Sequence, residues 1–207
     1  MTLKSLIDLS GPSLSDALPR RTLQSLGKRE NELYELLRTK NGFYAFESAL
    51  HVFPSGPAKK AAITLEEWND ASTWRACFDG LGDGLFFAED IFGGQFFIRG
   101  ESILTLDPET GRVESFARNL EEWASRVVDD FEVVTGHPLA HEWQQQHGRL
   151  PADSRLIPKT PFVLGGAYVV ENLYASEAAK GMRLRSEIAR QIRDLPNGAK
   201  VRLKVVE

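Results

Sequence analysis

The chain has 207 residues, 42% of them hydrophobic and 26% charged, which is typical of a globular protein and unlike a disordered or fibrous one. Its formal net charge of -4 argues against a general nucleic-acid-binding protein. The single cysteine, Cys77, excludes an intrachain disulfide and a cysteine zinc cage.

The start of the chain lacks the apolar stretch of a signal peptide, and no run of 18 apolar residues occurs anywhere. We therefore expect a cytoplasmic protein that has no membrane partner. Residues 1–21, rich in Ser, Pro and Leu, are expected to form an arm or a short surface helix.

Three helices are predicted before residue 80. A leucine stripe from Leu23 to Leu37 precedes the stop signal Asn41-Gly42, and the spacing of apolar residues in 43–53 favours a second helix. Thr64 and Glu67 form a capping box for a third helix, whose buried side includes Trp68 and Trp74.

Residues 84–98 are expected to organise the fold. Two apolar runs, each with a Phe-Phe pair, flank a turn-prone segment, as in a β-hairpin. Because successive strand side chains point to opposite faces, each pair places one ring on either side of the sheet. One face must be the core, and the other is covered by more protein or open to a partner.

Strands continue through 102–106 and 112–117, joined by the turn Asp107-Pro-Glu-Thr-Gly111, giving an antiparallel meander of about four strands. Helices follow at 120–134 and 138–147. A Pro-containing linker, 149–161, then precedes a strand at 167–170, a basic helix at 176–195 and a strand at 201–206.

The predicted class is therefore α+β, with a central, mostly antiparallel sheet flanked by helices and a C-terminal strand-helix-strand extension. We place one domain at residues 1–148 and the extension at 149–207, packed on the same domain.

Catalytic motifs are absent from the sequence. His137 and His141 are spaced i,i+4 beside Glu142, but they do not form the H-E-x-x-H pattern of zinc hydrolases. There is no P-loop or G-x-S-x-G motif. Cys77 is interpreted as a small buried hydrophobe. We expect no enzyme, no cofactor and no metal, and keep a metal-dependent hydrolase that uses the two histidines and Glu142 as a remote alternative.

Charge is unevenly distributed along the chain. Between residues 64 and 90 acidic residues greatly outnumber the single Arg75, whereas residues 180–204 are mainly basic. An acidic surface beside the hairpin favours docking of a basic protein, because complementary potentials speed encounter and set specificity. The partner-facing candidates are Glu66, Asp70, Asp83, Glu89 and Asp90.

The run Leu85-Phe-Phe-Ala-Glu-Asp-Ile-Phe-Gly-Gly-Gln-Phe-Phe-Ile98, with the turn after it and the helix containing Trp123, resembles the SUKH superfamily. That group includes the yeast Smi/Knr-type regulator of cell-wall assembly and bacterial immunity proteins of polymorphic toxin systems. The resemblance covers roughly residues 23–134. Within its pattern the residues expected to make the fold are Trp74, Phe87, Phe92, Gly93, Phe96 and Trp123.

The resemblance implies an α+β fold and a non-enzymatic protein that neutralises a cognate toxin, such as a nuclease with a basic surface, by binding it. A housekeeping adaptor with the same fold is the main alternative.

Overall fold

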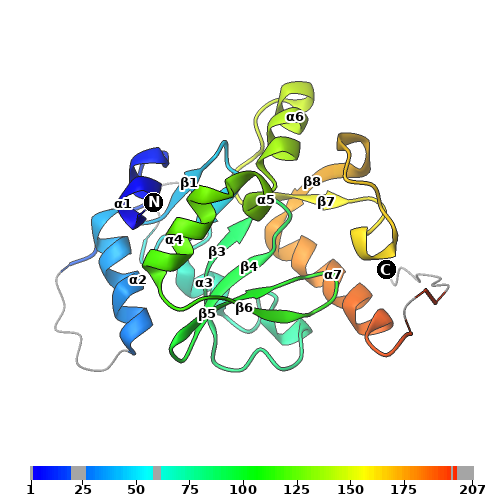
Figure 1. Cartoon of the computed structure of the whole chain (residues 1–207), viewed down its shortest axis with the longest axis horizontal. Coiled ribbons are helices and arrows are strands. Elements are labelled where there is room, and N and C mark those ends of the chain that lie inside the picture. The colour runs from blue at the N-terminus through cyan, green and yellow to red at the C-terminus, as the bar shows by residue number, and fades with distance from the viewer. Residues whose placement is uncertain (1, 20–26, 58–61, 197, 200–207) are drawn as a thin grey trace.

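The computed structural model describes residues 2–19, 27–57, 62–196, 198 and 199. It confirms the α+β class: a six-stranded antiparallel sheet in the order β1-β2-β3-β4-β5-β6 lies between helices (Figure 1). The strands are β1 (Phe43–Ala45), β2 (Leu50–Val52), β3 (Leu85–Asp90), β4 (Gln95–Arg99), β5 (Ser102–Leu106) and β6 (Val113–Ala117).

The helix predicted over residues 43–53 is wrong, because β1 and β2 form a hairpin there. All three residues of β2 are buried, so its apolar residues follow no alternating pattern from which a strand could be read. The hairpin turn consists of residues 46–49, and its first three residues, Phe46, Glu47 and Ser48, have φ angles of 51°, 53° and 71°. Three successive non-glycine residues in this left-handed region are uncommon.

The predicted placement of the phenylalanine pairs is confirmed. Phe86 stacks on Phe97 at a centroid distance of 4.6 Å on one face, and Phe87 meets Trp123 edge to face at 5.0 Å on the other. All four rings, including Phe96, are at most 3% exposed. The two faces of the sheet are thus both used for internal packing.

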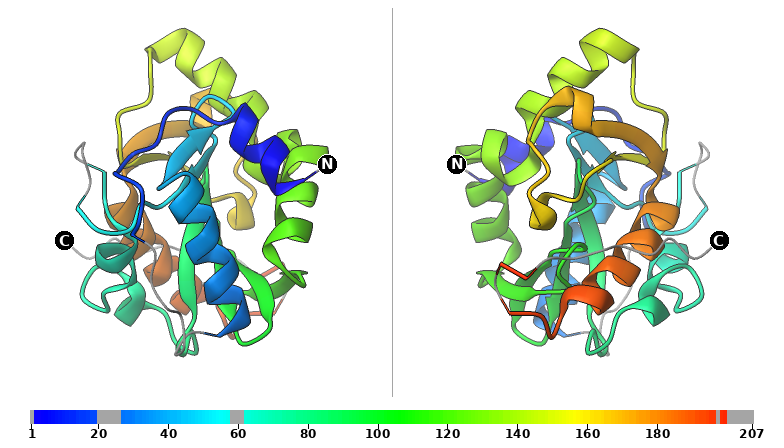
Figure 2. Two further views of the ribbon diagram at one scale, coloured as in Figure 1. Left: turned by 90° about the vertical axis from the view of Figure 1, so that its left-hand side faces the viewer. Right: turned by 90° about the vertical axis from the view of Figure 1, so that its right-hand side faces the viewer.

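Two groups of helices provide that packing (Figure 2). On one face lies α4 (Leu120–Asp129), with α1 (Leu3–Leu9) and α2 (Lys28–Thr39) beside it. The other face is covered by α3 (Leu65–Asn69), the 3₁₀ helix η1 (Arg75–Cys77) and α7 (Ala178–Ile192). The capping box that begins α3 is confirmed, with the Thr64 hydroxyl accepting from Glu67 N–H.

Two further helices follow α4. The predicted helix over 120–134 is interrupted at Asp130, so that α5 (Phe131–Thr135) is separate. The helix predicted at 138–147 is confirmed as α6 (His137–His147), which ends at Gly148 with φ 84°.

The C-terminal segment, residues 149–196, differs in detail from the prediction. The segment predicted as a linker contains β7 (Ser154–Pro158), which pairs with β8 (Leu173–Glu177) in a second sheet. Residues 167–170 are not a strand, and the short 3₁₀ helices η2 (Phe162–Leu164) and η3 (Val170–Asn172) lie between β7 and β8. The strand predicted at 201–206 lies outside the described residues.

One backbone hydrogen bond joins this segment directly to the β3-β4 turn: Leu156 N–H donates to Ile91 O at 2.9 Å.

None of the described helices combines the length and apolar character needed to cross a lipid bilayer.

Candidate functional site

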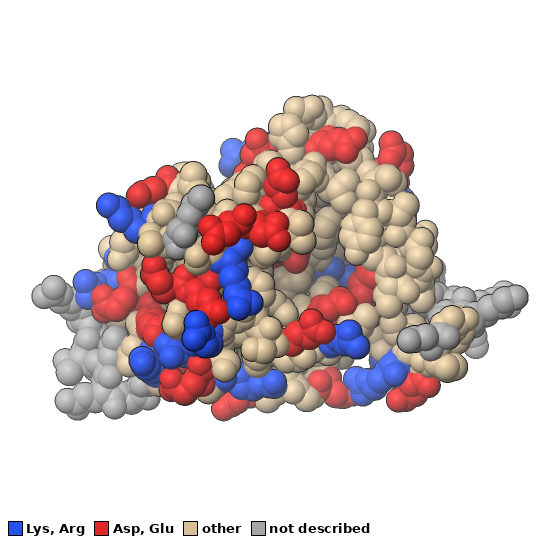
Figure 3. All heavy atoms as spheres, viewed as in Figure 1, with Lys and Arg blue, Asp and Glu red and all other residues tan. Residues whose placement is uncertain are grey.

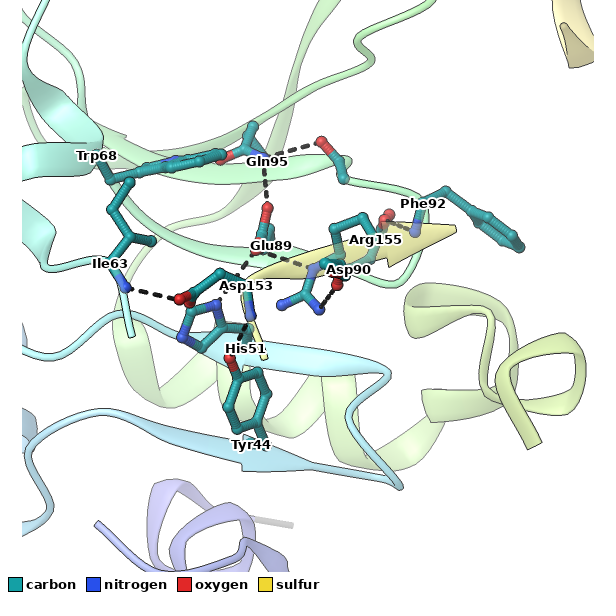
Figure 4. Close-up of polar contacts among 12 residues, drawn as sticks. Tyr44, His51, Ile63, Trp68, Glu89, Asp90, Phe92, Gln95, Asp153 and Arg155 are labelled. Carbon is teal, nitrogen blue, oxygen red and sulfur yellow. Dashed lines mark hydrogen bonds and ion pairs between the residues drawn. The ribbon is translucent and has the colours of Figure 1, made fainter. Parts of the chain in front are cut away.

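A row of polar side chains crosses one face of the sheet. The strand register pairs Tyr44 with His51, His51 with Glu89, and Glu89 with Gln95. Directly paired residues in neighbouring strands project from the same face. We call these four residues the polar row (Figure 4).

Arg155, on β7, reaches the centre of the polar row. Its Nε lies 2.9 Å from Glu89 Oε1, and His51 Nδ1 lies 3.2 Å from the same oxygen. Gln95 donates to Glu89 Oε2 at 3.3 Å and accepts from Trp68 Nε1 at 2.8 Å. Because a carboxylate only accepts, His51 donates through Nδ1. The Glu89 carboxylate is therefore surrounded by donors.

Burial and the neighbouring polar groups together set the charge states of this network. Burial lowers the pKa of His51 to about 4, so its imidazole is neutral near pH 7. Burial alone would raise the pKa of Glu89, but the Arg155 charge and the hydrogen bonds from His51 and Gln95 outweigh it and lower that pKa. The centre of the polar row is a buried Glu89–Arg155 ion pair.

The buried position of Glu89 corrects one prediction. Glu89 was expected to face a partner, yet its side chain is 0% exposed. Strand alternation turns it inward, where it pairs with a residue 66 positions further along the chain. Since Arg155 is only 1% exposed, this ion pair holds the C-terminal segment on the sheet and lies out of reach of a partner.

An open cavity of about 550 Å³ lies beside the β3-β4 turn, and Gln95 of the polar row is part of its lining. Its floor includes Phe96 and Thr105 of the sheet, and its walls come from α5 and the C-terminal segment. Figure 3 shows the face on which it opens, with acidic residues beside the hollow. We call this the acidic cavity, because Asp90, Asp107 and Glu109 contribute to its lining.

Asp90 is the carboxyl closest to the hairpin turn. Its Oδ1 accepts from the backbone N–H groups of Phe92 and Gly94, each at 2.8 Å. Burial nevertheless raises the pKa of Asp90 to about 7, against these hydrogen bonds and the charge of Arg185. Near neutral pH this carboxyl therefore responds readily to any further positive charge.

One oxygen of the Glu109 carboxylate is available to accept a hydrogen bond. Its Oε2 accepts from Val163 N–H at 2.9 Å, whereas Oε1 is buried and has no hydrogen-bond partner in the part of the chain that the structure describes. Burial also raises the pKa of this side chain, which is 5% exposed. The backbone N–H groups of Val163 and Phe162 and the charge of Arg185 oppose this rise. A buried acceptor without a well-aligned donor is costly, so Glu109 Oε1 is suited to receive a donor from an occupant.

Arg185 and an aromatic cluster complete the lining. The Arg185 guanidinium, 2% exposed, donates to the Phe92 carbonyl. Phe162 and Tyr168 stack at 3.9 Å with nearly parallel rings, and Phe92 meets Phe162 edge to face at 5.3 Å. The cavity thus combines flat apolar walls with three carboxyl groups and one guanidinium.

The structure separates the predicted partner-facing residues. Asp90 lines the acidic cavity, whereas Glu66, Asp70 and Asp83 are exposed residues outside its lining. Glu66 accepts from Ser55 and from Gly56 N–H, and Asp70 accepts from Ser72. The predicted acidic stretch 64–90 is therefore not one continuous surface.

The predicted fold-making residues occupy two environments. Trp74, Phe87, Phe96 and Trp123 are buried in the core. Phe92 and Gly93 instead shape the β3-β4 turn beside the acidic cavity, and Gly93 has φ 76°. The positive φ favours glycine here, and a Cβ at Gly93 would also lie 2.5 Å from the Arg185 guanidinium, which would have to shift.

Sequence reasoning missed Glu109, Arg155, Arg185 and the aromatic pair of the C-terminal segment. Glu109 appeared only as part of a turn, and the segment carrying the others has no motif that would assign them a role. The interpretation of Cys77 as buried is also wrong: Cys77 is exposed, because η1 turns it away from the core that Trp74 enters.

The histidines are arranged differently from the hydrolase hypothesis. His137 and His141 do come together, but their carboxylate neighbour is Glu47 of the β1-β2 turn. Glu142 instead accepts from Gln146 one turn further along α6. The trio of His137, His141 and Glu142 is therefore not assembled.

Comparison with known proteins gives a fold and no family. No protein-family profile matches the chain, and no curated protein matches it. The crystal structure of Atu4351 from Agrobacterium tumefaciens is similar, with a TM-score of 0.55, 14% sequence identity, and coverage of 87% of this chain and 86% of that chain. At this identity the similarity concerns the fold alone.

Proposed function

We propose that this protein is a non-enzymatic binding domain of the immunity type, which neutralises a basic protein toxin by binding it at the acidic cavity. The resemblance of residues 23–134 to the SUKH superfamily supports the immunity role. The chemistry of the cavity supports the choice of a basic partner.

The observation that carries the proposal is the unsatisfied Glu109 carboxylate inside an aromatic-walled cavity. An arginine or lysine of the partner would donate to Glu109 Oε1, which lacks a donor among the described residues. The Phe162–Tyr168 stack offers flat faces on which a guanidinium or an alkyl stem can lie. One inserted basic side chain thus satisfies both features.

The charge balance of the cavity favours the same occupant. Within the part of the chain that the structure describes, the lining that contains Asp90, Asp107 and Glu109 has one cationic side chain, Arg185. Arg185 donates to the carbonyls of Phe92 and Gly181, and Glu109 Oε1 has no hydrogen-bond partner among the described residues. A second cation would compensate the remaining negative charge.

The test uses the product of the gene that flanks this one, which the proposal predicts to be the toxin. The purified pair should form a 1:1 complex, measured by calorimetry, and toxic activity should be lost at saturation. Glu109→Gln should weaken binding about tenfold or more, because a charge-assisted hydrogen bond is replaced by a neutral one. Glu66→Gln, which alters an exposed carboxylate outside the cavity, is the matched control and should bind normally.

Two results would contradict the proposal. A saturated toxin that keeps its full activity would exclude neutralisation and favour an adaptor role. Equal weakening by Glu109→Gln and Glu66→Gln would place the interface outside the acidic cavity.

A further inference from the structure

A cluster independent of the acidic cavity lies where α6 meets the β1-β2 turn. His137 and His141 are one helical turn apart, so their imidazoles project from the same side of α6. Glu47 lies against them, with Oε2 2.7 Å from His141 Nδ1 and 4.0 Å from His137 Nε2. We call these three residues the histidine cluster.

The turn that presents Glu47 is strained and held from two sides. Glu47 has φ 53° between two other residues of positive φ, a conformation that is unfavourable for non-glycine residues. Gln144 of α6 donates to the Glu47 carbonyl at 2.8 Å. Phe46 stacks on Phe131 of α5 at 4.8 Å. The neighbouring elements thus fix the Glu47 backbone beside the histidines.

The spacing of the three donor atoms suits one small metal ion. One donor atom from each residue lies within 4.8 Å of the other two. Tetrahedral zinc, with bonds of about 2.1 Å, requires neighbouring donors about 3.4 Å apart. The distances from Glu47 Oε2, 2.7 and 4.0 Å, lie on either side of this value. Side-chain adjustments of less than about 1 Å would complete the geometry.

The cluster is also accessible and has an outer partner. His137, His141 and Glu47 have side-chain exposures of 22%, 45% and 52%, so an ion can enter from solvent. Gln145 lies 2.8 Å from His141 Nε2. With a metal on Nδ1, the Nε2 nitrogen carries the proton and donates to the Gln145 amide oxygen once that amide is turned over.

We propose that Glu47, His137 and His141 form a binding site for a divalent transition-metal ion that prefers imidazole ligands, with zinc as the reference ion. The site has three protein ligands, and a water molecule completes the coordination. The ion replaces the proton shared by His141 Nδ1 and Glu47, and it links the β1-β2 turn to α6. This assignment replaces the expectation from sequence that no metal is bound.

The experiment uses the full chain carrying Cys77→Ser, because the exposed thiol is a competing soft ligand. Protein freed of metal with a chelator is titrated with Zn²⁺ by calorimetry and with Co²⁺ by visible absorption. We expect one ion per chain and absorption bands of tetrahedral cobalt. His137→Ala, His141→Ala and Glu47→Gln should each weaken binding about tenfold or more, since each removes a ligand.

Two variants of the same helix serve as controls. Glu142→Gln and His147→Ala alter a carboxylate and an imidazole outside the cluster, and both should bind the ion as the parent does. His147 stacks on Trp143 and contacts its carbonyl. Absence of a stoichiometric binding event, or equal losses in the control and cluster variants, would overturn the proposal. Circular dichroism of each variant establishes that it is folded.

Discussion

Arg155 shows how a single buried charge connects distant parts of the chain. Its guanidinium meets the Glu89 carboxylate in a region where both side chains are at most 1% exposed. Removing one partner of a buried ion pair leaves the other charge uncompensated, which is far more costly than replacing both.

We therefore predict that Arg155→Met lowers the free energy of unfolding by about 3 to 5 kcal/mol, since Glu89 loses its compensating charge. The double variant Arg155→Met/Glu89→Gln should recover most of that loss. Urea denaturation at pH 7 measures both. If the double variant is no more stable than the single one, the buried charge is not the source of the loss.

Protonation of the buried Asp90 carboxyl stabilises the folded protein, so its contribution to the free energy of unfolding falls as the pH rises. Its folded pKa of about 7 lies above the ordinary aspartate value of 3.8. The folded protein therefore binds the proton more tightly than the unfolded chain does. The resulting stabilisation is complete below about pH 4 and is lost as the pH rises through 7.

Asp90→Asn should accordingly be more stable than the parent at pH 8, by on the order of 3 kcal/mol, because a neutral amide replaces a buried carboxylate. This advantage should shrink as the pH falls from 8 to 4. Urea denaturation at several pH values tests the difference, with exposed Asp83→Asn as control. A difference that does not vary with pH would contradict the assignment.

The comparison of Asp90→Asn with the parent also distinguishes the pH-dependent contribution of Asp90 to stability from that of His51. Burial depresses the pKa of His51 from 6.5 to about 4, so its contribution is present above pH 6.5 and lost as the pH falls through 4. The two residues thus oppose each other in the parent, and His51 cancels in the difference between the parent and Asp90→Asn.

Among the elements, the β1-β2 turn has a strained backbone. Phe46, Glu47 and Ser48 all have positive φ, although none is a glycine. Tertiary contacts with α5 and α6 maintain this geometry, which suggests that the Glu47 side chain has a purpose other than stability.

In the metal-free protein, the free energy of unfolding of Glu47→Gly should exceed that of Glu47→Ala by about 1 kcal/mol, because glycine adopts φ of 53° without steric cost. Glu47→Ala removes the same carboxylate but keeps the strain. Thermal denaturation of the two variants with chelator present makes the comparison. Equal stability of both would show that the turn stores little strain.

For the whole molecule, the sequence predicted the elements whose signals are local. The phenylalanine hairpin, the Asp107–Gly111 turn and the Thr64 cap depend on neighbouring residues, and all three are present. β2 and β7 were missed because their burial depends on distant contacts: β2 is buried on both faces, and β7 carries a buried Arg155.

The candidate sites were less predictable for the same reason. The acidic cavity joins Asp90 and Glu109 to Phe162 and Arg185, and the histidine cluster joins Glu47 to residues at least 90 positions away. Acidic residues close in sequence, such as Asp70 and Glu89, lie in unrelated environments, one exposed and one fully buried. A charge count along the chain contains no information about that separation.

The acidic cavity lies between the sheet, which contributes Phe96 and Thr105 to its floor, and the C-terminal segment, which contributes Phe162, Tyr168 and Arg185 to its walls. Any molecule that fills the cavity must contact both the sheet and the C-terminal segment, so its binding free energy stabilises the packing of one against the other. Hydrogen exchange of amides in β4 and in α7 should then slow together when the cavity is occupied. The bound partner would therefore stabilise the contact between the sheet and the C-terminal segment, and its dissociation would increase local opening in both.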